Sequence, residues 1–230
     1  MTRLAYYLTK VVCWLFFRLG FWLEVSGGAH VPKRGAFILA SNHVSYLDPP
    51  VVGVACPRRL VFMARADLFD QALLGMFLRA VGAIALKREG GDVAAIRMAL
   101  EELRDGRPVA IFPEGGRQPG GALGTAKRGV GLLAVTAQVP IVPALVRGTF
   151  DAWPPHARRL RRRKIHVAFG PPIPYTDFSF STTASGPRPA LGERRGGRAR
   201  RSQHEQRLAE AVTLAWQRLA AQRQPAHPTP

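Results

Sequence analysis

A histidine and an aspartate lie five residues apart in the segment SNHVSYLDPP, residues 41–50. A neutral imidazole can accept a proton from a hydroxyl group, and a carboxylate beside it can orient the ring and stabilise the imidazolium that forms. His43 and Asp48 could therefore act as a general base and its orienting partner. On a regular helix, residues five apart point about 140° away from each other. The two side chains can meet only if the segment between them forms a turn.

Asp48 also has a structural interpretation. Asp followed by Pro49 is typical of a helix N-cap and first helical position, and the proline disfavours a helical conformation at Asp48. The two interpretations are compatible, because a carboxylate at a helix start can face back towards a loop imidazole. Ser45 could instead be a nucleophile, but it lies in the same turn as His43 and the sequence has no GxSxG elbow. A loop-stabilising hydroxyl is the favoured role for Ser45.

Cationic residues follow two further apolar runs. In residues 109–118, VAIFPEGGRQ, the run leads into two glycines and Arg117, and residues 83–89, AIALKRE, end similarly in Lys87 and Arg88. Binding sites of α/β proteins lie where strands end, glycine allows close backbone approach, and the planar arginine fork matches phosphate. The alternative is an ordinary glycine turn with a solvated arginine. With the histidine base, these residues predict a phosphorylated substrate that carries a hydroxyl to activate.

Strand-like and helix-like segments alternate between about residues 35 and 170. The apolar runs of strand length are residues 36–41, 60–65, 83–88, 108–113, 141–148 and 164–170, and the segments with helical spacing are roughly 49–55, 68–79, 92–104 and 128–137. This alternation predicts an α/β fold with a largely parallel sheet in one domain, residues 31–178. We expect a disordered Arg/Gly/Pro-rich linker over 179–202, a helix over 203–222 and a flexible tail over 223–230.

The first 25 residues are strongly apolar and aromatic, but charged residues interrupt them, so no uncharged run reaches the ~18–20 residues of a transmembrane helix. At about 100° per residue, the charged side chains fall within roughly 120° of the helix circumference: Arg3, Lys10, Arg18 and Glu24. The opposite side is apolar. This pattern predicts a membrane-associated amphipathic helix over residues 1–30 that lies in the bilayer interface. A helix packed on the core of the protein and a cleaved signal peptide are the alternatives.

The charge balance is strongly basic, with 33 Lys and Arg against 15 Asp and Glu and a formal net charge of +18. Such a surface favours anionic partners, whether phospholipid headgroups, nucleic acid or acidic substrates. Six of the seven residues from 158 to 164 are basic. This run is either a solvated loop or a contact to membrane or phosphate. A nucleic-acid-binding protein would use the same charge and the RRGGRARR run, residues 194–201, but would leave the aromatic N-terminal segment unexplained.

No pattern in the sequence is typical of a metal site. Cys13 and Cys56 are the two cysteines, and neither a CxxC motif nor an HExxH motif is present. We therefore expect neither a metal ion nor another cofactor.

Four blocks, in this order, resemble the glycerolipid acyltransferase family, and most of all its bacterial 1-acyl-glycerol-3-phosphate acyltransferases. They are SNHVSYLD at 41–48, GAIALKR at 82–88, FPEGGR at 112–117 and VPIVP at 139–143, and AKRG at 126–129 fits the lysine-x-glycine that follows the third block. The resemblance covers about residues 20–175. It implies a glycerolipid-acyltransferase-like α/β fold, with a mostly parallel sheet flanked by helices.

The resemblance also implies roles for individual residues. His43 is expected to be the general base and Asp48 its partner. The expected substrate-binding residues are Arg88, Glu114, Gly115 and Arg117, with Asn42, Ser45, Lys87 and Lys127 as supporting residues. The fourth block is associated with the acyl side of the site. Two positions depart from the family pattern, since Gly116 stands where threonine is usual and Gln118 where serine is common. The lost hydroxyl groups could alter recognition of the acceptor headgroup.

The resulting expectation is an O-acyltransferase that moves a fatty acyl group from acyl-CoA or acyl carrier protein to the hydroxyl of 1-acyl-glycerol-3-phosphate. The product would be phosphatidic acid, in phospholipid biosynthesis. The expected location is the cytoplasmic face of the bacterial cell membrane, on an anionic lipid surface. The alternatives are another lysolipid acceptor, such as a lyso-ornithine lipid, a membrane-docked relative without activity, and the basic nucleic-acid-binding protein.

Overall fold

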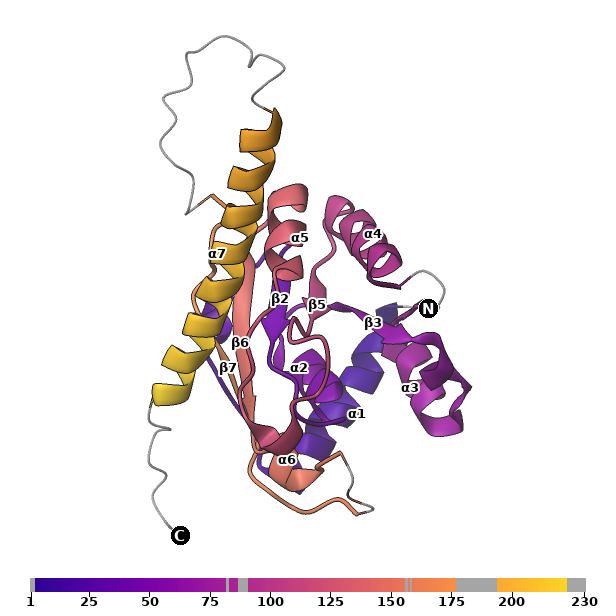
Figure 1. Ribbon diagram of the computed structural model, residues 1–230. Helices are drawn as coiled ribbons and strands as arrows, with labels where there is room; N and C mark the ends of the chain where they lie inside the picture. The colour runs from indigo at the N-terminus through magenta and orange to yellow at the C-terminus, as the bar shows by residue number, and fades with distance from the viewer. Residues whose placement is uncertain are drawn as a thin grey trace.

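A mostly parallel sheet forms the centre of the computed structural model, which describes residues 3–81, 83–86, 91–155, 157, 159–176 and 194–222 (Figure 1). In the part of the chain described, seven strands pair in the order β1-β7-β6-β2-β5-β3-β4. Their bounds are β1 Glu24–Ser26, β2 Ile38–Ser41, β3 Val61–Arg65, β4 Ile84–Leu86, β5 Val109–Ile111, β6 Ile141–Arg147 and β7 His166–Phe169. Neighbouring strands are parallel except β6 and β7, which are antiparallel. The prediction of an α/β fold with a largely parallel sheet is confirmed.

Helices cover both faces of the sheet. They are α1 Arg3–Phe21, α2 Asp48–Ala55, α3 Ala72–Val81, α4 Gly91–Arg104, α5 Gly129–Ala137, α6 Thr149–Ala152 and α7 Arg194–Ala221, with short 3-10 turns at η1 Gly28–His30, η2 Ala66–Asp70 and η4 Pro119–Gly121. Figure 1 shows α7, α5 and α4 next to one another, and α1 beside α2. The four segments predicted as helical correspond to α2, η2 with α3, α4 and α5.

The central strand β2 is buried on both faces. Its Leu39 side chain packs into the core beneath α1 and α2, whereas Ile38 and Ala40 pack into the core beneath α5 and α7. Alternate residues of a strand point to opposite faces, so a continuous apolar run is what a strand between two helical layers requires. All six predicted strands are present. Strand β1 was missed because it is a three-residue edge strand, half or fully exposed, without an apolar run.

The C-terminal helix α7 begins at Arg194, nine residues before the expected start at Gln203. Residues 194–202 therefore belong to the helix and not to the predicted linker. At the end of this extension, Arg201 donates to the Thr136 hydroxyl of α5 at 2.8 Å, and Arg128, just before α5, donates to the Ser202 hydroxyl at 2.6 Å. The rest of the predicted linker, from 179 to 193, and the tail over 223–230 lie outside the described residues.

The N-terminal helix α1 ends at Phe21, before the expected end at residue 30, and packs one of its sides on the core. Phe17 and Phe21 are buried against the core, and Lys10 lies on this inward side, where its ammonium group donates to the Cys56 carbonyl at the C-terminal end of α2. Free carbonyl groups at a helix end attract such a cation. Burial lowers the pKa of Lys10. Glu24 is not in the helix at all, because it begins β1.

The outward side of α1 is largely apolar, although Arg18 is exposed too and donates to the Leu23 carbonyl. The exposed side chains on it are Leu8, Val11, Val12, Trp14, Leu15, Phe16 and Leu19, followed by Trp22 after the helix. One side of the helix thus packs on the core, as one alternative expected, while the other side leaves a large apolar surface in solvent. Within the described residues, no helix has both the length and the apolar character that crossing a bilayer requires.

Candidate active site

The loop between β2 and α2 brings His43 and Asp48 together. The His43 Nδ1 atom lies 2.9 Å from Asp48 Oδ2. Asp48 is fully buried, and the same Oδ2 atom accepts the backbone N–H groups of Val44 at 2.6 Å and Ser45 at 2.7 Å. Leu47 occupies the N-cap and Asp48 is the first helical residue, so the expected capping position is wrong by one residue. The predicted turn is present, and Asp48 both holds the turn and orients the imidazole.

The contacts of His43 engage Nδ1 and leave Nε2 available to accept a proton. An ionised carboxylate only accepts hydrogen bonds, so Nδ1 donates to Asp48 and the neutral ring keeps its lone pair on Nε2. The Phe112 ring stacks on the imidazole, with 4.4 Å between the centroids and 29° between the planes. His43 is therefore fixed by a carboxylate in its plane and an aromatic ring on its face. It is placed to accept a proton through Nε2.

Glu114, which follows β5, fastens a second loop to this turn. Its Oε2 atom accepts the backbone N–H of His43 at 2.9 Å, and its Oε1 atom accepts the backbone N–H of Gly124 at 3.1 Å. Glu114 is 4% exposed. Burial raises the pKa of its carboxyl group, although the two N–H donors act in the opposite direction. Because both oxygens are engaged by the backbone, Glu114 holds the two loops together.

Arg117 lies beside the turn that holds His43 and Asp48. Its guanidinium carbon is 3.7 Å from the centre of the Tyr46 ring, and Tyr46 belongs to the turn between His43 and Asp48. The Arg117 Nη1 atom is buried and has no hydrogen-bond partner among the described residues. Buried polar groups are nearly always paired, so a free arginine nitrogen beside the turn that holds His43 indicates a place for an anion.

The glycine turn after Glu114 brings a second cation close. Gly115 has a φ of +77°, and a β-carbon added there would overlap the Lys127 ammonium group. Lys127 is also anchored through its backbone N–H, which donates to the Pro113 carbonyl at 2.8 Å. A β-carbon at Gly116 would meet no atom within 4 Å. The site is thus closely packed at Gly115 and open at Gly116. Lys87 and Arg88, the other predicted cations, lie outside the described residues.

The supporting residues Asn42 and Ser45 have structural contacts. The buried Asn42 amide donates to the Val146 carbonyl at 3.1 Å and accepts the Val146 N–H at 2.7 Å, which ties the turn to β6. The Ser45 hydroxyl donates to the Trp153 carbonyl at 2.7 Å. It also accepts the Leu47 N–H at 3.2 Å. Ser45 therefore stabilises the loop, as the sequence indicated, and is not placed as a nucleophile.

Sequence reasoning missed three aromatic residues of the site: Tyr46, Phe112 and Trp153. Phe112 precedes Pro-Glu-Gly-Gly-Arg directly, and its place in that block is a usable signal. Trp153 contacts Ser45 over a separation of 108 residues and lies 5.8 Å from the Tyr46 ring. No local pattern reports such a contact, because it depends on where β6 and α6 are placed in the fold.

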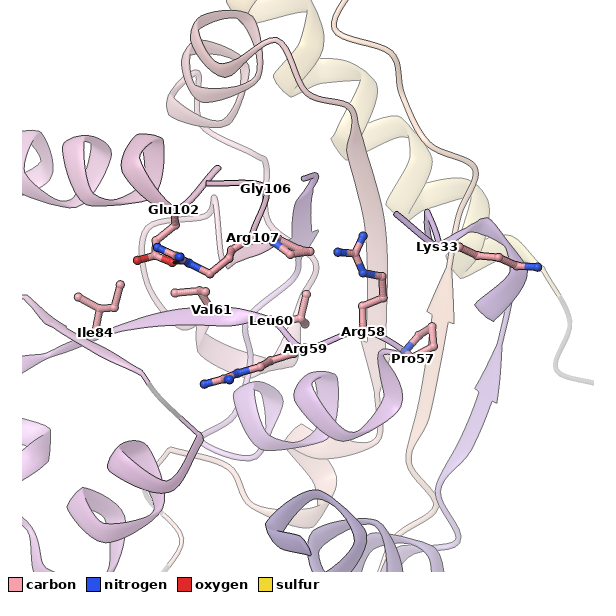
Figure 2. Close-up of a pocket in the computed structure, with 11 residues that line it drawn as sticks. Lys33, Pro57, Arg58, Arg59, Leu60, Val61, Ile84, Glu102, Gly106 and Arg107 are labelled. Atoms are coloured by element: carbon pink, nitrogen blue, oxygen red, sulfur yellow. Dashed lines mark hydrogen bonds and ion pairs between the residues drawn. The ribbon is translucent and has the colours of Figure 1, made fainter. Parts of the chain in front are cut away.

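A cavity of about 470 Å³ lies at the other edge of the sheet (Figure 2). Leu60 and Pro108 line it where β3 and β5 begin, whereas His43 and Glu114 follow the ends of parallel strands. The basic residues around it do not converge, since the Lys33 and Arg59 side chains extend in opposite directions (Figure 2). This cavity is separate from the candidate site. Among the described residues, no three His, Cys, Asp or Glu side chains gather as metal ligands.

A family model described as acyltransferase matches residues 23–147, a span that contains both loops of the site. The chain belongs to the acyltransferase family. This membership confirms the prediction of an O-acyltransferase.

Two relatives show how far the similarity extends. The acyltransferase is 28% identical over 159 residues to the 1-acyl-sn-glycerol-3-phosphate acyltransferase of Bacillus subtilis, over 68% of this chain and 76% of that protein. It is 35% identical over 159 residues to the alpha form of that enzyme from Bos taurus, over 67% of this chain but only 55% of the relative.

A solved structure supports the fold independently. The crystal structure of the 1-acyl-sn-glycerophosphate acyltransferase from Thermotoga maritima matches with a TM-score of 0.67 and 23% identity, over 96% of this chain and 83% of that chain. At this identity the likeness establishes the fold of the acyltransferase and nothing finer.

Proposed function

We propose that the acyltransferase moves a fatty acyl group from a thioester donor, acyl-CoA or acyl carrier protein, to the hydroxyl of 1-acyl-glycerol-3-phosphate, which forms phosphatidic acid. The observation that carries the proposal is the free, buried Nη1 of Arg117 beside the His43–Asp48 pair. The arginine nitrogen fits an acceptor phosphate, and the His43–Asp48 pair fits an acceptor hydroxyl. The names of the relatives describe an acceptor with both groups.

The chemistry needs one base and no covalent acyl-enzyme intermediate. His43 Nε2 accepts the proton of the acceptor hydroxyl while its oxygen attacks the thioester carbonyl carbon. The tetrahedral intermediate then collapses, the carbon–sulfur bond breaks, and the imidazolium returns the proton to the departing thiolate. Asp48 stabilises the imidazolium between these steps. General base catalysis of this kind contributes about 10²- to 10⁴-fold in rate.

The phosphate of the acceptor is held by cations on the β5 side of the site. Arg117 offers two parallel N–H groups to the phosphate, and stacking on Tyr46 fixes the plane of the fork. The Lys127 ammonium group lies against Gly115. The resemblance adds Arg88 to this set, and the strand-end pattern adds Lys87. Holding the phosphate places the hydroxyl at the base, which is the orientational part of the catalysis.

The proposed location is the cytoplasmic face of the cell membrane. The lysophospholipid acceptor resides in the bilayer, and the thioester donors are cytoplasmic. The outward apolar side of α1, with Trp14 and Trp22 among its exposed residues, supports association with the bilayer interface.

Another lysolipid acceptor is the second candidate, because Gly116 and Gln118 stand where the resemblance expects hydroxyl-bearing residues and the position of Gly116 is open. A panel of acceptors separates the two candidates. Purified protein would be given labelled acyl-CoA with 1-acyl-glycerol-3-phosphate, a lysophospholipid with a larger headgroup, or a lyso-ornithine lipid. We expect transfer to 1-acyl-glycerol-3-phosphate, and a severe loss of it in Arg117→Ala. Preference for the phosphate-free acceptor, unaffected by Arg117→Ala, would contradict the proposal.

A further inference from the structure

The exposed apolar side of α1 ends beside the basic segment that precedes β7, residues 159–164. Arg162 joins the two, since its guanidinium group donates to the Leu19 carbonyl at 3.1 Å and the Gly20 carbonyl at 3.3 Å and lies 5.2 Å from the Trp22 ring centre. The last carbonyl groups of a helix have no partner within the helix and carry partial negative charge. Arg162 therefore fixes the segment against the C-terminal end of α1. Lys164 adds a 2.8 Å ion pair with Glu24.

The other basic residues of this segment do not bind the C-terminal end of α1 or Glu24. Arg159, Arg161 and Arg163 are exposed, and among the described residues none of these three side chains has a hydrogen-bond or ion-pair partner. Leu160, between them, is 47% exposed. A row of free arginines with an apolar residue among them, beside an exposed apolar helix, is the composition of a surface that contacts a negatively charged bilayer.

We propose that Arg159, Arg161 and Arg163 bind the headgroups of anionic phospholipids while the outward side of α1 and Leu160 enter the apolar boundary of the bilayer. We call this set of residues, with Trp22, the docking face. The inference rests on the proposed association with the membrane and adds the class of lipid and the residues that select it. Arg162 is a positioning residue for the segment and not a headgroup ligand.

The docking face adjoins the catalytic turn. The Arg161 backbone N–H donates to the Ala152 carbonyl at 2.8 Å, and the next residue, Trp153, accepts the Ser45 hydroxyl and lies beside Tyr46. Figure 1 shows α6 and one end of α1 at the same end of the molecule. Contact of this face with a bilayer brings His43 near the surface in which the acceptor resides.

The test compares the triple variant Arg159→Gln, Arg161→Gln, Arg163→Gln with the wild type in vesicle flotation, on phosphatidylcholine alone and with about 30% phosphatidylglycerol. We expect the triple variant to bind the anionic vesicles on the order of 100-fold more weakly, and neutral vesicles as the wild type does. The matched control Arg34→Gln, Arg97→Gln, Arg104→Gln removes the same charge from exposed sites elsewhere. The affinity of this control variant for anionic vesicles should stay within a few-fold of that of the wild type.

Acyl transfer in detergent, with a detergent-dispersed acceptor, shows that each variant is folded, and the triple variant should retain wild-type activity there. Wild-type affinity of the triple variant for anionic vesicles would overturn the proposal, as would an equal loss in the control. So would unchanged vesicle binding with a loss of affinity only for acyl carrier protein, since the segment would then recognise the donor. A wild type that binds through these arginines but transfers no acyl group in detergent would support the docking face and contradict the proposed reaction.

Discussion

The backbone N–H of His43 donates to Glu114 Oε2 at 2.9 Å, which joins the loop after β2 to the loop after β5. The proposed base, His43, is on the first loop and Arg117 is on the second. The distance between them is therefore fixed by contacts between the loops, namely this buried carboxylate and the Gln118 N–H, which donates to the His43 carbonyl at 2.8 Å. Because β2 and β5 are parallel neighbours, both loops emerge at the same edge of the sheet.

Replacing Glu114 by glutamine should lower both stability and activity. Glutamine has one carbonyl oxygen, so either the His43 or the Gly124 N–H loses its acceptor. A buried polar group left without a partner costs about 1–3 kcal/mol. Urea unfolding and acyl-transfer rates would measure the two effects. Glu101→Gln, at an exposed position of α4, is the matched control and should change neither. A Glu114→Gln protein with wild-type stability and rate would show that the two loops are held by other contacts.

The contribution of Glu114 to stability should depend on pH. Burial raises the pKa of this carboxyl group above its ordinary value of 4.5, so the folded protein holds the proton more tightly than the unfolded chain. The stabilisation is then fully present below the unfolded pKa and is lost as the pH rises through the folded pKa. Unfolding of the wild type and Glu114→Gln from about pH 4 to 7 should show the stability difference narrowing as the pH rises. A difference that widens instead would mean that the two N–H donors outweigh burial.

Arg117→Lys should weaken acceptor binding more than it slows the reaction at saturation. Lysine keeps the charge but loses the planar fork and the stacking on Tyr46. We expect the KM for 1-acyl-glycerol-3-phosphate to rise about tenfold or more, since a charge-assisted bidentate contact is lost, while the KM for the thioester is unchanged. Steady-state kinetics with each substrate varied in turn would show this. The control Arg104→Lys on α4 should leave both KM values unchanged. If Arg117→Lys raises the KM for the thioester more than the KM for the acceptor, Arg117 binds the acyl donor instead.

Gly116→Thr should be tolerated, whereas Gly115→Thr should not. Gly116 has open space around a β-carbon and no positive φ, but Gly115 has a φ of +77° and is covered by Lys127. We expect Gly115→Thr to lower the melting temperature clearly, through backbone strain at the positive φ, and to displace the Lys127 ammonium group. Gly116→Thr restores the family hydroxyl and should lower the KM for 1-acyl-glycerol-3-phosphate. If Gly116→Thr leaves the preference among acceptors unchanged, the departure at this position has no role in headgroup recognition.

Much of this arrangement follows from local sequence pattern. The apolar runs predicted six strands, and a parallel sheet places the residues that follow β2 and β5 at one edge, where His43 and Arg117 are found. Periodicity could separate the two sides of α1 but not tell which side packs on the core. The packed side is defined by distant partners, such as the core around Phe17 and Phe21 and the Cys56 carbonyl, which accepts from Lys10 across 46 residues. The Ser45–Trp153 and Thr136–Arg201 contacts likewise join distant residues that no local pattern reports.

The most direct test of the account is acyl transfer from labelled acyl-CoA to 1-acyl-glycerol-3-phosphate by the wild type and by His43→Ala. Circular dichroism and binding of both proteins to anionic vesicles serve as controls for folding. The account predicts transfer by the wild type and a loss of about 10²- to 10⁴-fold or more in the variant, because the base is removed. A folded His43→Ala protein that transfers acyl groups at the wild-type rate would contradict the central claim that His43 is the general base.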